Sequence, residues 1–523
     1  MRKRNSSLLL LLALSLIFTA AWGQEVAPAQ KPQEAGKRLY QKNCSFCHGE
    51  KGEGNGPVAD YLYPRPRNFK LATYKFRATA SGERPTDEDL FRVVTRGIPG
   101  TSMPSWDVLK EEERRQLVQY IKSLSEEPWP KDIPQPIKIT KEIRATKEAI
   151  GKGKEVYKKA KCWECHGEEG RGDGPSAPTL KDDLGFYIKA FDMTKHWLIK
   201  GGNTARDIFI RFSTGVDGTP MPSFGDTFSE EERWHLAHYV KSLQVEPEPS
   251  AQVVLRARRL RRDLPLDPKD PEWQRSPSLV VPLTGQVIAK PRWQVPAVDT
   301  VIVQALFNEK AVAFLLVWSD PSKDTVHQSG ADVKTQEKTG YVKIDPAKGQ
   351  SEKLRDAIAL QFPVRIPEGP DKPYLFRGNP GRPVQIWEWK ADWQADSARK
   401  SPVEEYNAQG ANKPYIAQPA EGQEVQGKGI WEKGQWRVVM HRPLTGKDKA
   451  TDIAFVAGKL IPFAIQAWDG SNGEKGLLMS LSSWHFLLLT EAKPVTVYLY
   501  PLLGVVFAGA LELWLVRRLK RKS

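Results

Sequence analysis

Two distant copies of one short pattern constrain the fold of this 523-residue chain more than any other feature. The pattern is Cys-x-x-Cys-His, found at residues 44–48 and 162–166. Each copy is followed by a Gly-Thr-x-Met-Pro string, with its methionine at Met103 or Met221. The two cysteine motifs and the two methionines are both offset by 118 residues. Equal offsets between distant motifs indicate two copies of one domain.

All four cysteines of the chain belong to these two motifs. Four cysteines could form two disulfides, but here a histidine directly follows each pair. Thiols at this spacing reach two vinyl groups on one edge of a porphyrin, and the histidine is then placed to bind the iron. The sequence therefore predicts two covalently attached haems c. The predicted attachment residues are Cys44, Cys47, Cys162 and Cys165, and the first iron ligands are His48 and His166.

Helix-forming stretches surround both motifs. Gly36 and Tyr40 lie four residues apart on one helix face, and Gly153 and Tyr157 repeat that pair in the second copy. Between the helices the chain is rich in glycine and proline, as expected where haem replaces part of the core. The expected helices span residues 34–42, 87–95, 111–124, 205–214 and 229–243.

Both repeats resemble class I cytochrome c domains, over residues 30–126 and 145–245. In that family the sixth iron ligand is a methionine in a Gly-Thr-x-Met-Pro loop, so the resemblance implies Met103 and Met221 as ligands. A methionine opposite a histidine raises the reduction potential of the iron. Because both axial positions are then filled, such a haem passes electrons and has no open site for a substrate.

Other histidines and methionines in the repeats are weighed as alternatives. Met193 and His196 are rival iron ligands in the second repeat. His235 and His238 lie on an expected helix and are interpreted as solvated or packing residues.

Both ends of the chain indicate export and membrane attachment. Residues 1–23 have the basic start, apolar run and small final residues of a secretory signal peptide, with an uncleaved anchor as the alternative. Residues 495–516 carry only Glu512 as a charge and are long enough to span a bilayer. The basic tail 517–523 favours a cytoplasmic C-terminus, with the bulk of the chain in the periplasm. The net charge of +15 is therefore not interpreted as nucleic-acid binding.

The part of the chain after residue 270 is expected to be rich in β-structure. Its β-prone runs lie between glycine, proline, aspartate and asparagine, which favours a mainly antiparallel β-sandwich. The predicted strands span residues 301–306, 311–318, 357–362, 384–389, 435–440, 463–467 and 480–488. Met440 and His441 fall on one of these strands and are interpreted as packing residues.

Three segments of this part carry a second resemblance, namely 356–363, 385–391 and 467–474. They are similar to the haem b-binding gamma subunit of ethylbenzene dehydrogenase-type molybdoenzymes, with relatives in dimethyl sulfide dehydrogenase, selenate and chlorate reductases and nitrite oxidoreductases. In that family a methionine and a lysine hold one b-type haem. The corresponding positions here are Arg377 and Met479. Arginine is a poor iron ligand because it stays protonated. One haem b with Met479 as a ligand, opposite Lys475, His485 or another group, is therefore an open expectation.

The chain is therefore expected to be multidomain, with two all-α cytochrome c domains, a mainly antiparallel β-sandwich domain and one C-terminal transmembrane helix. An arginine-rich stretch before the β domain is interpreted as a solvated linker. The expected order is signal peptide (1–23), cytochrome c domains (24–127 and 141–246), basic linker (247–269), β domain (270–492), transmembrane helix (495–516) and cytoplasmic tail (517–523).

These features predict a membrane-anchored carrier of two haems c, or of three haems if haem b is bound. The gamma-subunit resemblance implies molybdopterin and iron–sulfur subunits as partners, in a complex such as a nitrite oxidoreductase or nitrate reductase. Another cytochrome or a membrane electron carrier would be the second redox partner. The alternatives are a stand-alone electron carrier to a respiratory complex and a redox enzyme with catalysis in the β domain. The sequence shows no nucleophile–base set or phosphate loop, so no catalytic residue is assigned.

Overall fold

The computed structural model describes residues 32–132, 134–328, 335–342, 353–411, 413–490 and 496–520. The expected signal peptide, 1–23, lies outside the described residues. The chain forms two compact units. The first unit combines Met1–Ile139 with Ser213–Phe224, and the second combines Thr140–Phe212 with Gly225–Ser523. The methionine loop of the second repeat therefore belongs to the first unit.

The first unit holds the helices of the first repeat. They are α2 (Pro32–Asn43), α3 (Ser45–His48), the 3-10 turn η1 (Ala59–Tyr61), α4 (Asp87–Arg96) and α5 (Glu111–Ser123). Thr86 caps the start of α4: its side chain accepts a hydrogen bond from the Asp89 amide, and the Asp89 carboxylate accepts one from the Thr86 amide. Tyr40, Leu117 and other apolar side chains form the core of the unit. A Cβ on Gly36 would collide with the backbone of α5, so this glycine permits the close packing of α2 on α5.

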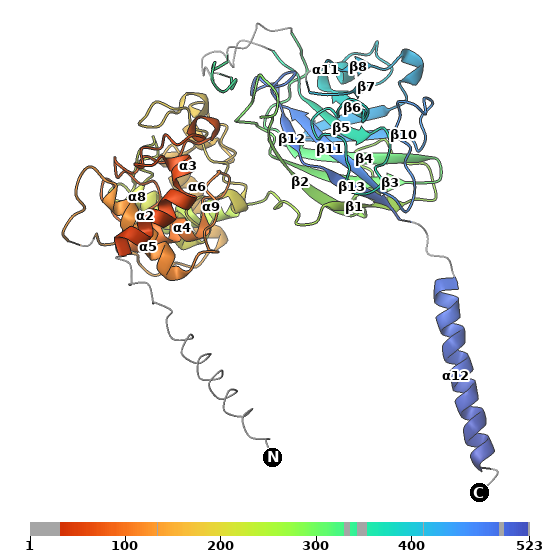
Figure 1. Ribbon diagram of the computed structural model, residues 1–523, viewed down its shortest axis with the longest axis horizontal. Coiled ribbons are helices and arrows are strands. Elements are labelled where there is room, and N and C mark those ends of the chain that lie inside the picture. The colour runs from red at the N-terminus through yellow and green to blue at the C-terminus, as the bar shows by residue number, and fades with distance from the viewer. Residues whose placement is uncertain are drawn as a thin grey trace, which may run out of the picture. The chain divides into compact units, whose positions relative to one another are not determined.

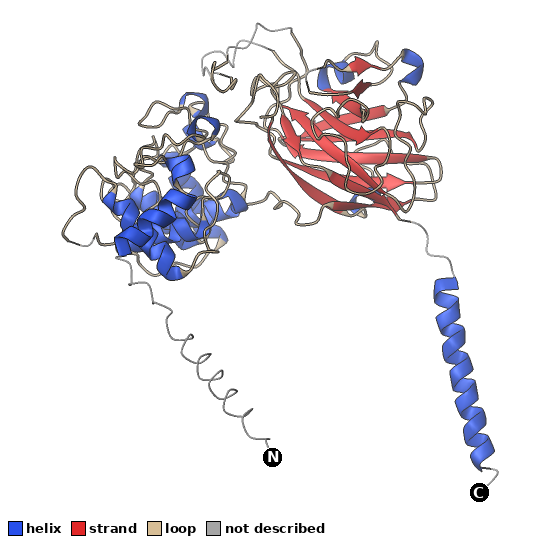
Figure 2. Cartoon of the chain, viewed as in Figure 1, coloured by secondary structure: helices blue, strands red, loops and turns tan. Residues whose placement is uncertain are grey.

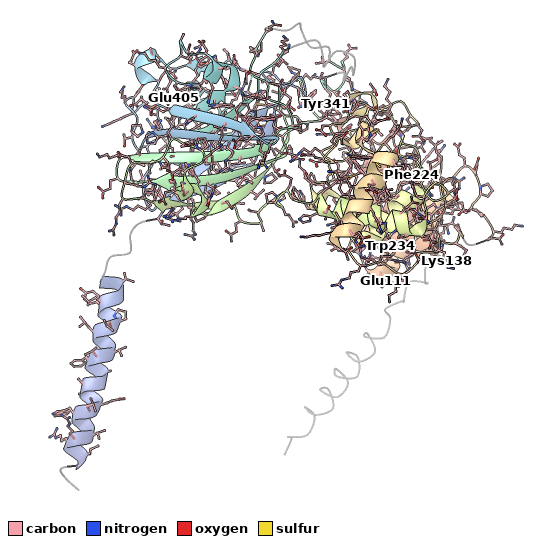
Figure 3. All side chains as sticks on the ribbon, turned by 180° about the vertical axis from the view of Figure 1, so that it is seen from behind. Glu111, Lys138, Phe224, Trp234, Tyr341 and Glu405 are labelled. Atoms are coloured by element: carbon pink, nitrogen blue, oxygen red, sulfur yellow. The ribbon has the colours of Figure 1, made fainter. Side chains whose placement is uncertain are left out.

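The second unit contains the other helices of the second repeat. They are α6 (Lys147–Lys159), α7 (Trp163–His166), η2 (Ala177–Thr179), η3 (His196–Leu198), α8 (Ala205–Thr214, which ends in the first unit) and α9 (Glu230–Ser242). Gly153 repeats the role of Gly36, because a Cβ there would collide with the carbonyl oxygen of His235 on α9. Trp234, labelled in Figure 3, is also on α9 and is fully buried.

Within the described residues, thirteen strands form the β domain of the second unit. Figures 1 and 2 show them as a stack of twisted arrows. The first seven are β1 (Val254–Arg259), β2 (Ser278–Gly285), β3 (Thr300–Phe307), β4 (Ala311–Ser319), β5 (Ala357–Pro363), β6 (Val384–Lys390) and β7 (Val403–Ala408). The others are β8 (Ile416–Ala417), β9 (Gln426–Glu432), β10 (Gln435–Pro443), β11 (Leu460–Trp468), β12 (Ser480–Ser482) and β13 (His485–Leu489). Two short helices, α10 (Pro271–Gln274) and α11 (Ala391–Ala395), and the turn η4 (Ala420–Gly422) lie in its connections.

The strand order is β8-β7-β6-β5-β11-β12-β2-β3-β4-β10-β9, with antiparallel pairing along this path. The β1 strand pairs in parallel with both β13 and β3, and β13 pairs with β11. The expectation of a mainly antiparallel sheet domain is therefore confirmed. Its core is a large cluster of buried aromatic and aliphatic side chains, among them Phe314, Trp387 and Trp436.

The prediction that residues 247–269 form a basic linker is wrong for the central part of this stretch. Residues 254–259 form β1, and Leu255 and Ala257 are buried in the core of the β domain. The apolar residues alternate with arginines, a strand pattern that the high positive charge concealed. Ion pairs then hold Arg258 to Glu272 and Arg259 to Glu309.

The C-terminal helix α12 spans Thr496–Lys520. Its segment Leu499–Leu519 is long and apolar enough to cross a membrane, with a mean hydropathy of 1.9. None of this segment is buried against the rest of the chain. The first residue of the expected span, Val495, lies outside the described residues.

Candidate haem sites

The first cysteine motif forms a short helix directly behind α2. The amides of Cys47 and His48 donate to the carbonyl of Cys44 over 3.2 and 2.9 Å, which fixes the turn. The Nδ1 atom of His48 lies 3.0 Å from the carbonyl oxygen of Arg67. This carbonyl holds the proton on Nδ1 and leaves Nε2 as the free lone pair of the imidazole. Burial lowers the pKa of His48, which favours the neutral form that binds iron.

The second motif has the same geometry. The Nδ1 atom of His166 lies 2.9 Å from the carbonyl oxygen of Phe191. Burial also lowers the pKa of His166. Behind the motif, Tyr157 donates a 2.6 Å hydrogen bond to the carbonyl of Gly167. Tyr40 does the same to the carbonyl of Gly49 in the first repeat, over 2.7 Å.

All four motif thiols are free, which suits thioether formation and contradicts a pair of disulfides. Burial raises the pKa of Cys44 and of Cys162 to about 12. Both thiols are therefore protonated at neutral pH.

The two methionine loops share one set of hydrogen bonds. The Met103 amide donates to Thr101 Oγ1 over 3.1 Å, and the Met103 carbonyl accepts from Ile98 over 3.0 Å. The Met221 amide donates to Thr219 Oγ1 over 3.2 Å, and the Met221 carbonyl accepts from Val216 over 3.1 Å. The threonine of each Gly-Thr-x-Met-Pro string therefore fixes the backbone of the methionine.

Three buried polar atoms lie in the chain between the first haem motif and α4. Tyr74 Oη, Arg77 Nη1 and Thr79 Oγ1 are buried and have no hydrogen-bond partner among the described residues. All three can donate, and a haem brings two propionates that accept hydrogen bonds. The free imidazole nitrogen of His48 and the two thiols fit a covalently bound haem. When bound, this group supplies a one-electron carrier, while the chain orients the iron ligands and limits water at the site.

The rival ligands, Met193 and His196, lie in the chain between α7 and α8. Met193 takes the position that Phe69 has in the first repeat, because the Met193 amide donates to Gly170 as the Phe69 amide donates to Gly52, both over 2.6 Å. The Met193 side chain is buried, and a Cβ on Gly170 would lie 3.3 Å from Met193 Cβ. His196 begins the η3 turn and contacts the ring of Trp197.

The two helix histidines pack, in line with one of the two interpretations given to them. His235 and His238 on α9 are both buried. His238 Nε2 lies 2.8 Å from the carbonyl oxygen of Ile143.

An arginine of the first repeat, which was not predicted from the sequence, binds the methionine loop of the second repeat. Arg77 is fully buried, and its Nη2 donates to the Thr214 carbonyl over 3.1 Å and to Asp217 over 2.7 Å. Asp217 also accepts from Ser81 Oγ over 3.1 Å and from the Gly82 amide over 3.0 Å. These bonds join the first repeat to the methionine loop of the second within one unit.

The two positions that correspond to the iron ligands of the gamma-subunit family both lie in packed surroundings. Met479 is fully buried, in a packed cluster that includes Phe376 and Trp468. The guanidinium of Arg377 lies 3.9 Å from the ring centre of Tyr415. A protonated guanidinium is no iron ligand, so the residues present do not fit this group. Met440 is also fully buried, on β10, and His441 follows it on the same strand.

Comparison with known proteins matches three families. The family "Cytochrome C oxidase, cbb3-type, subunit III" matches residues 31–121, "Cytochrome c" matches 150–244 and "Ethylbenzene dehydrogenase" matches 270–413. Cytochrome c55X of Stutzerimonas stutzeri is 32% identical over 115 residues, or 21% of this chain and 82% of that protein.

Two further relatives cover larger shares of the chain. The respiratory nitrate reductase heme subunit ORF7 of Haloferax mediterranei is 24% identical over 253 residues, or 48% of this chain and 79% of that protein. A chain of the solved Kuenenia stuttgartiensis reducing HAO-like protein complex is 47% identical, with a TM-score of 0.38, and the match covers 41% of this chain and 99% of that one. This chain therefore belongs to the c-type cytochromes and joins two cytochrome c domains to a domain of the ethylbenzene dehydrogenase gamma-subunit type.

Proposed function

We propose that this chain is a membrane-anchored dihaem cytochrome that transfers electrons as the gamma-like subunit of a molybdoenzyme complex. The observation that carries the proposal is the repeated geometry of the two haem motifs. In each, a backbone carbonyl holds Nδ1 of the histidine, and a threonine holds the backbone of the methionine. A haem held by the histidine and the methionine would supply one-electron transfer and would leave no open position for a substrate.

The proposed ligand set assigns one covalent haem to each repeat. Cys44 and Cys47 attach the first haem, and Cys162 and Cys165 attach the second. The proposed axial pairs are His48 with Met103 and His166 with Met221. No haem b is included, because the positions of the two family ligands hold Arg377 and Met479 in packed surroundings.

The relatives and the C-terminal helix support the proposed partner subunits and the proposed membrane location. A relative is named as a heme subunit of a respiratory nitrate reductase, and the β domain matches the ethylbenzene dehydrogenase family. We therefore assign a molybdopterin subunit and an iron–sulfur subunit as partners, in a nitrite-oxidising or nitrate-reducing complex. The two haems would exchange electrons with these subunits and with a second partner, which is another cytochrome or a membrane electron carrier. The basic end of α12, with Arg517 and Arg518, supports a cytoplasmic C-terminus and periplasmic haem domains in this proposal.

The ligand assignment is tested by replacing one sulfur at a time. The Met103→His and Met221→His variants exchange the thioether for an imidazole, which lowers the potential of the haem concerned. In a redox titration followed by absorbance, each variant should lower one midpoint potential and leave the other unchanged. Met440→Leu is the matched control, because it removes a sulfur from β10 in the β domain. Two unchanged potentials in a methionine-loop variant would contradict that assignment.

The partner assignment is tested by isolating the native complex. The chain is extracted from membranes in a mild detergent, purified and examined by mass spectrometry. A molybdopterin subunit and an iron–sulfur subunit should co-purify in equal amounts with this chain. A dihaem protein recovered alone, from cells in which such subunits are present, would contradict the complex and favour the stand-alone carrier. Carbon monoxide should leave the spectrum of the reduced protein unchanged, whereas binding would indicate open iron and a catalytic role.

A further inference from the structure

Three buried aspartates meet at one end of the β domain. Asp320 follows β4, Asp356 precedes β5 and Asp469 follows β11. One carboxylate oxygen from each lies within 4.8 Å of those of the other two. All three side chains are buried, Asp320 and Asp356 completely and Asp469 to all but 4%. The fold therefore gathers three carboxylates from segments that are far apart in the sequence.

A buried arginine compensates two other buried acids of the same domain. Arg442, which is fully buried, lies 3.7 Å from Glu405 and 4.0 Å from Asp452; Glu405 is labelled in Figure 3. The charge of Lys189 acts to lower the pKa of Asp469, but burial is the larger effect and raises it. Three like charges in a dry interior are strongly unfavourable unless a cation or protons neutralise them.

Hydrogen bonds orient two of the carboxylates and leave one oxygen open. Asp356 accepts from the Gly470 amide over 3.0 Å, from the Asp324 amide over 2.7 Å and from Trp436 Nε1 over 2.9 Å. Asp469 accepts from Ser471 Oγ and from the Asn472 amide over 2.6 and 3.1 Å.

The open oxygen belongs to Asp320. Its Oδ1 accepts from the Ser322 amide over 3.1 Å, but its Oδ2 is buried without any hydrogen-bond partner among the described residues. Burial, and next the charge of Asp469, raise the pKa of Asp320 well above its usual value. A buried carboxylate oxygen without a donor, in a group of three carboxylates, is a position at which a cation can bind.

From this geometry we propose that Asp320, Asp356 and Asp469 bind one Ca²⁺ ion that joins the ends of β4, β5 and β11. Carboxylate oxygens are hard ligands, and Ca²⁺ binds them at 2.3–2.6 Å in a flexible shell of six to eight oxygens. Three atoms no more than 4.8 Å apart have a common point within about 2.8 Å of each, so small movements complete the contacts. Mg²⁺ requires shorter contacts and a stricter octahedron, and it is the less suitable ion.

The local backbone supports a fixed site. A Cβ on Gly470 would collide with the carbonyl of Leu354 and lie 2.9 Å from Asp324 Cβ, so the chain after Asp469 needs a glycine to reach the other segments. The site also adjoins the contact with the second repeat, because Arg171 donates to Ser319, the residue before Asp320. The bound ion therefore stabilises the β domain at the segment that the second repeat contacts.

The test uses the full chain with its haems, purified in detergent and depleted of metal with a chelator. Calcium is added back and measured by elemental analysis after gel filtration, and thermal unfolding is followed with and without it. We expect one Ca²⁺ per chain and a melting temperature that rises by several degrees with Ca²⁺, because a ligand that binds only the folded state stabilises it. Magnesium at the same concentration should give a smaller rise.

Two variants assign the effect to the cluster. Asp320→Asn keeps the side-chain shape, removes one charge and should weaken Ca²⁺ binding at least tenfold, with an unchanged haem spectrum. Asp371→Asn changes an exposed carboxylate of the same domain and should behave as the wild type. Calcium binding by Asp320→Asn at wild-type strength would overturn the proposal. If that variant does not accumulate, the wild type decides: no stoichiometric calcium and no shift in melting temperature would overturn it equally.

Discussion

At the scale of single residues, we expect substitution of the Arg77–Asp217 ion pair to cause a large loss of stability. Arg77 is a fully buried cation, and Asp217 is the carboxylate that pairs with it. Burial lowers the pKa of Arg77, and the nearby Asp217 counteracts this effect. A buried charge that loses its partner keeps its desolvation cost without the compensating attraction.

Asp217→Ala should therefore destabilise the first unit, which contains both residues. We expect a loss of about 3 kcal/mol in the free energy of unfolding, measured by denaturant titration and haem absorbance. Asp107→Ala, at an exposed position of the same unit, should change it by less than about 0.5 kcal/mol. Equal stability of Asp217→Ala and the wild type would show that this ion pair contributes nothing.

Residue patterns predicted the covalent sites but not their surroundings. The motif at 44–48 and the threonine before Met103 are local in sequence, so their spacing carries the prediction. The carbonyl that holds the histidine is not local, since it lies 19 residues after His48 and 25 residues after His166. The three clustered aspartates are still further apart and depend on strand pairing, which no spacing rule reveals.

At the scale of elements, two helix crossings rest on single glycines. The α6 and α9 helices touch where Gly153 meets the backbone of His235, and α2 and α5 touch in the same way at Gly36. The glycine–tyrosine pairs in the sequence predicted helices with a shared face. They did not reveal which partner helix comes close, because that depends on tertiary packing.

Gly153→Ala should force α6 away from α9. We expect a destabilisation of about 1–3 kcal/mol, the usual cost of overfilling a packed contact. Gly151→Ala, two residues earlier on the same helix, has open space around its new Cβ. It should stabilise the chain by up to about 1 kcal/mol, because alanine favours the helix. Thermal unfolding of both variants checks the pair, and a stable Gly153→Ala protein would contradict the close crossing.

The second repeat and the β domain are joined by a buried lysine. Lys195 Nζ lies 2.6 Å from Asp299 and 3.0 Å from Asp192. Burial alone would raise the pKa of Asp299, but the charge of Lys195 outweighs it and the pKa lies below the usual 3.8. A carboxyl with a lowered pKa contributes stability above its unfolded pKa, and this contribution disappears as the pH falls through its folded pKa.

Asp299→Asn should therefore change the acid side of the stability profile. Above about pH 5 the variant should be less stable than the wild type, because the ion pair is lost. Below about pH 4 the difference should shrink, since the wild-type carboxyl becomes protonated. Melting temperatures of both proteins between pH 3 and pH 7 measure this, and a difference that is constant with pH would count against the ion pair.

At the scale of the whole molecule, the order of the domains was predictable and one boundary was not. The apolar stretch 495–516 and the basic residues that follow it predicted the helix α12. The stretch 254–259 was misassigned because its arginines mask a buried strand of Leu255 and Ala257. Pairing with β13, far away in the sequence, makes this segment part of the β domain.

Removal of α12 should free the protein from the membrane. A chain that ends after residue 490 should appear in the soluble periplasmic fraction with its haem spectrum unchanged, because the apolar segment Leu499–Leu519 is gone. The full chain should need detergent for extraction. Retention of the shortened chain on washed membranes would show that another surface, or a membrane-bound partner, anchors it.

The proposed electron transfer depends above all on two covalent haems in one chain. The mass of the denatured polypeptide, measured after acid-acetone treatment, tests this most directly. We predict the mass of the chain from Gln24 plus two haems, with Cys162→Ala and Cys165→Ala together reducing it to one haem. A denatured chain that carries no haem, with all of its colour in the acetone, would contradict the account.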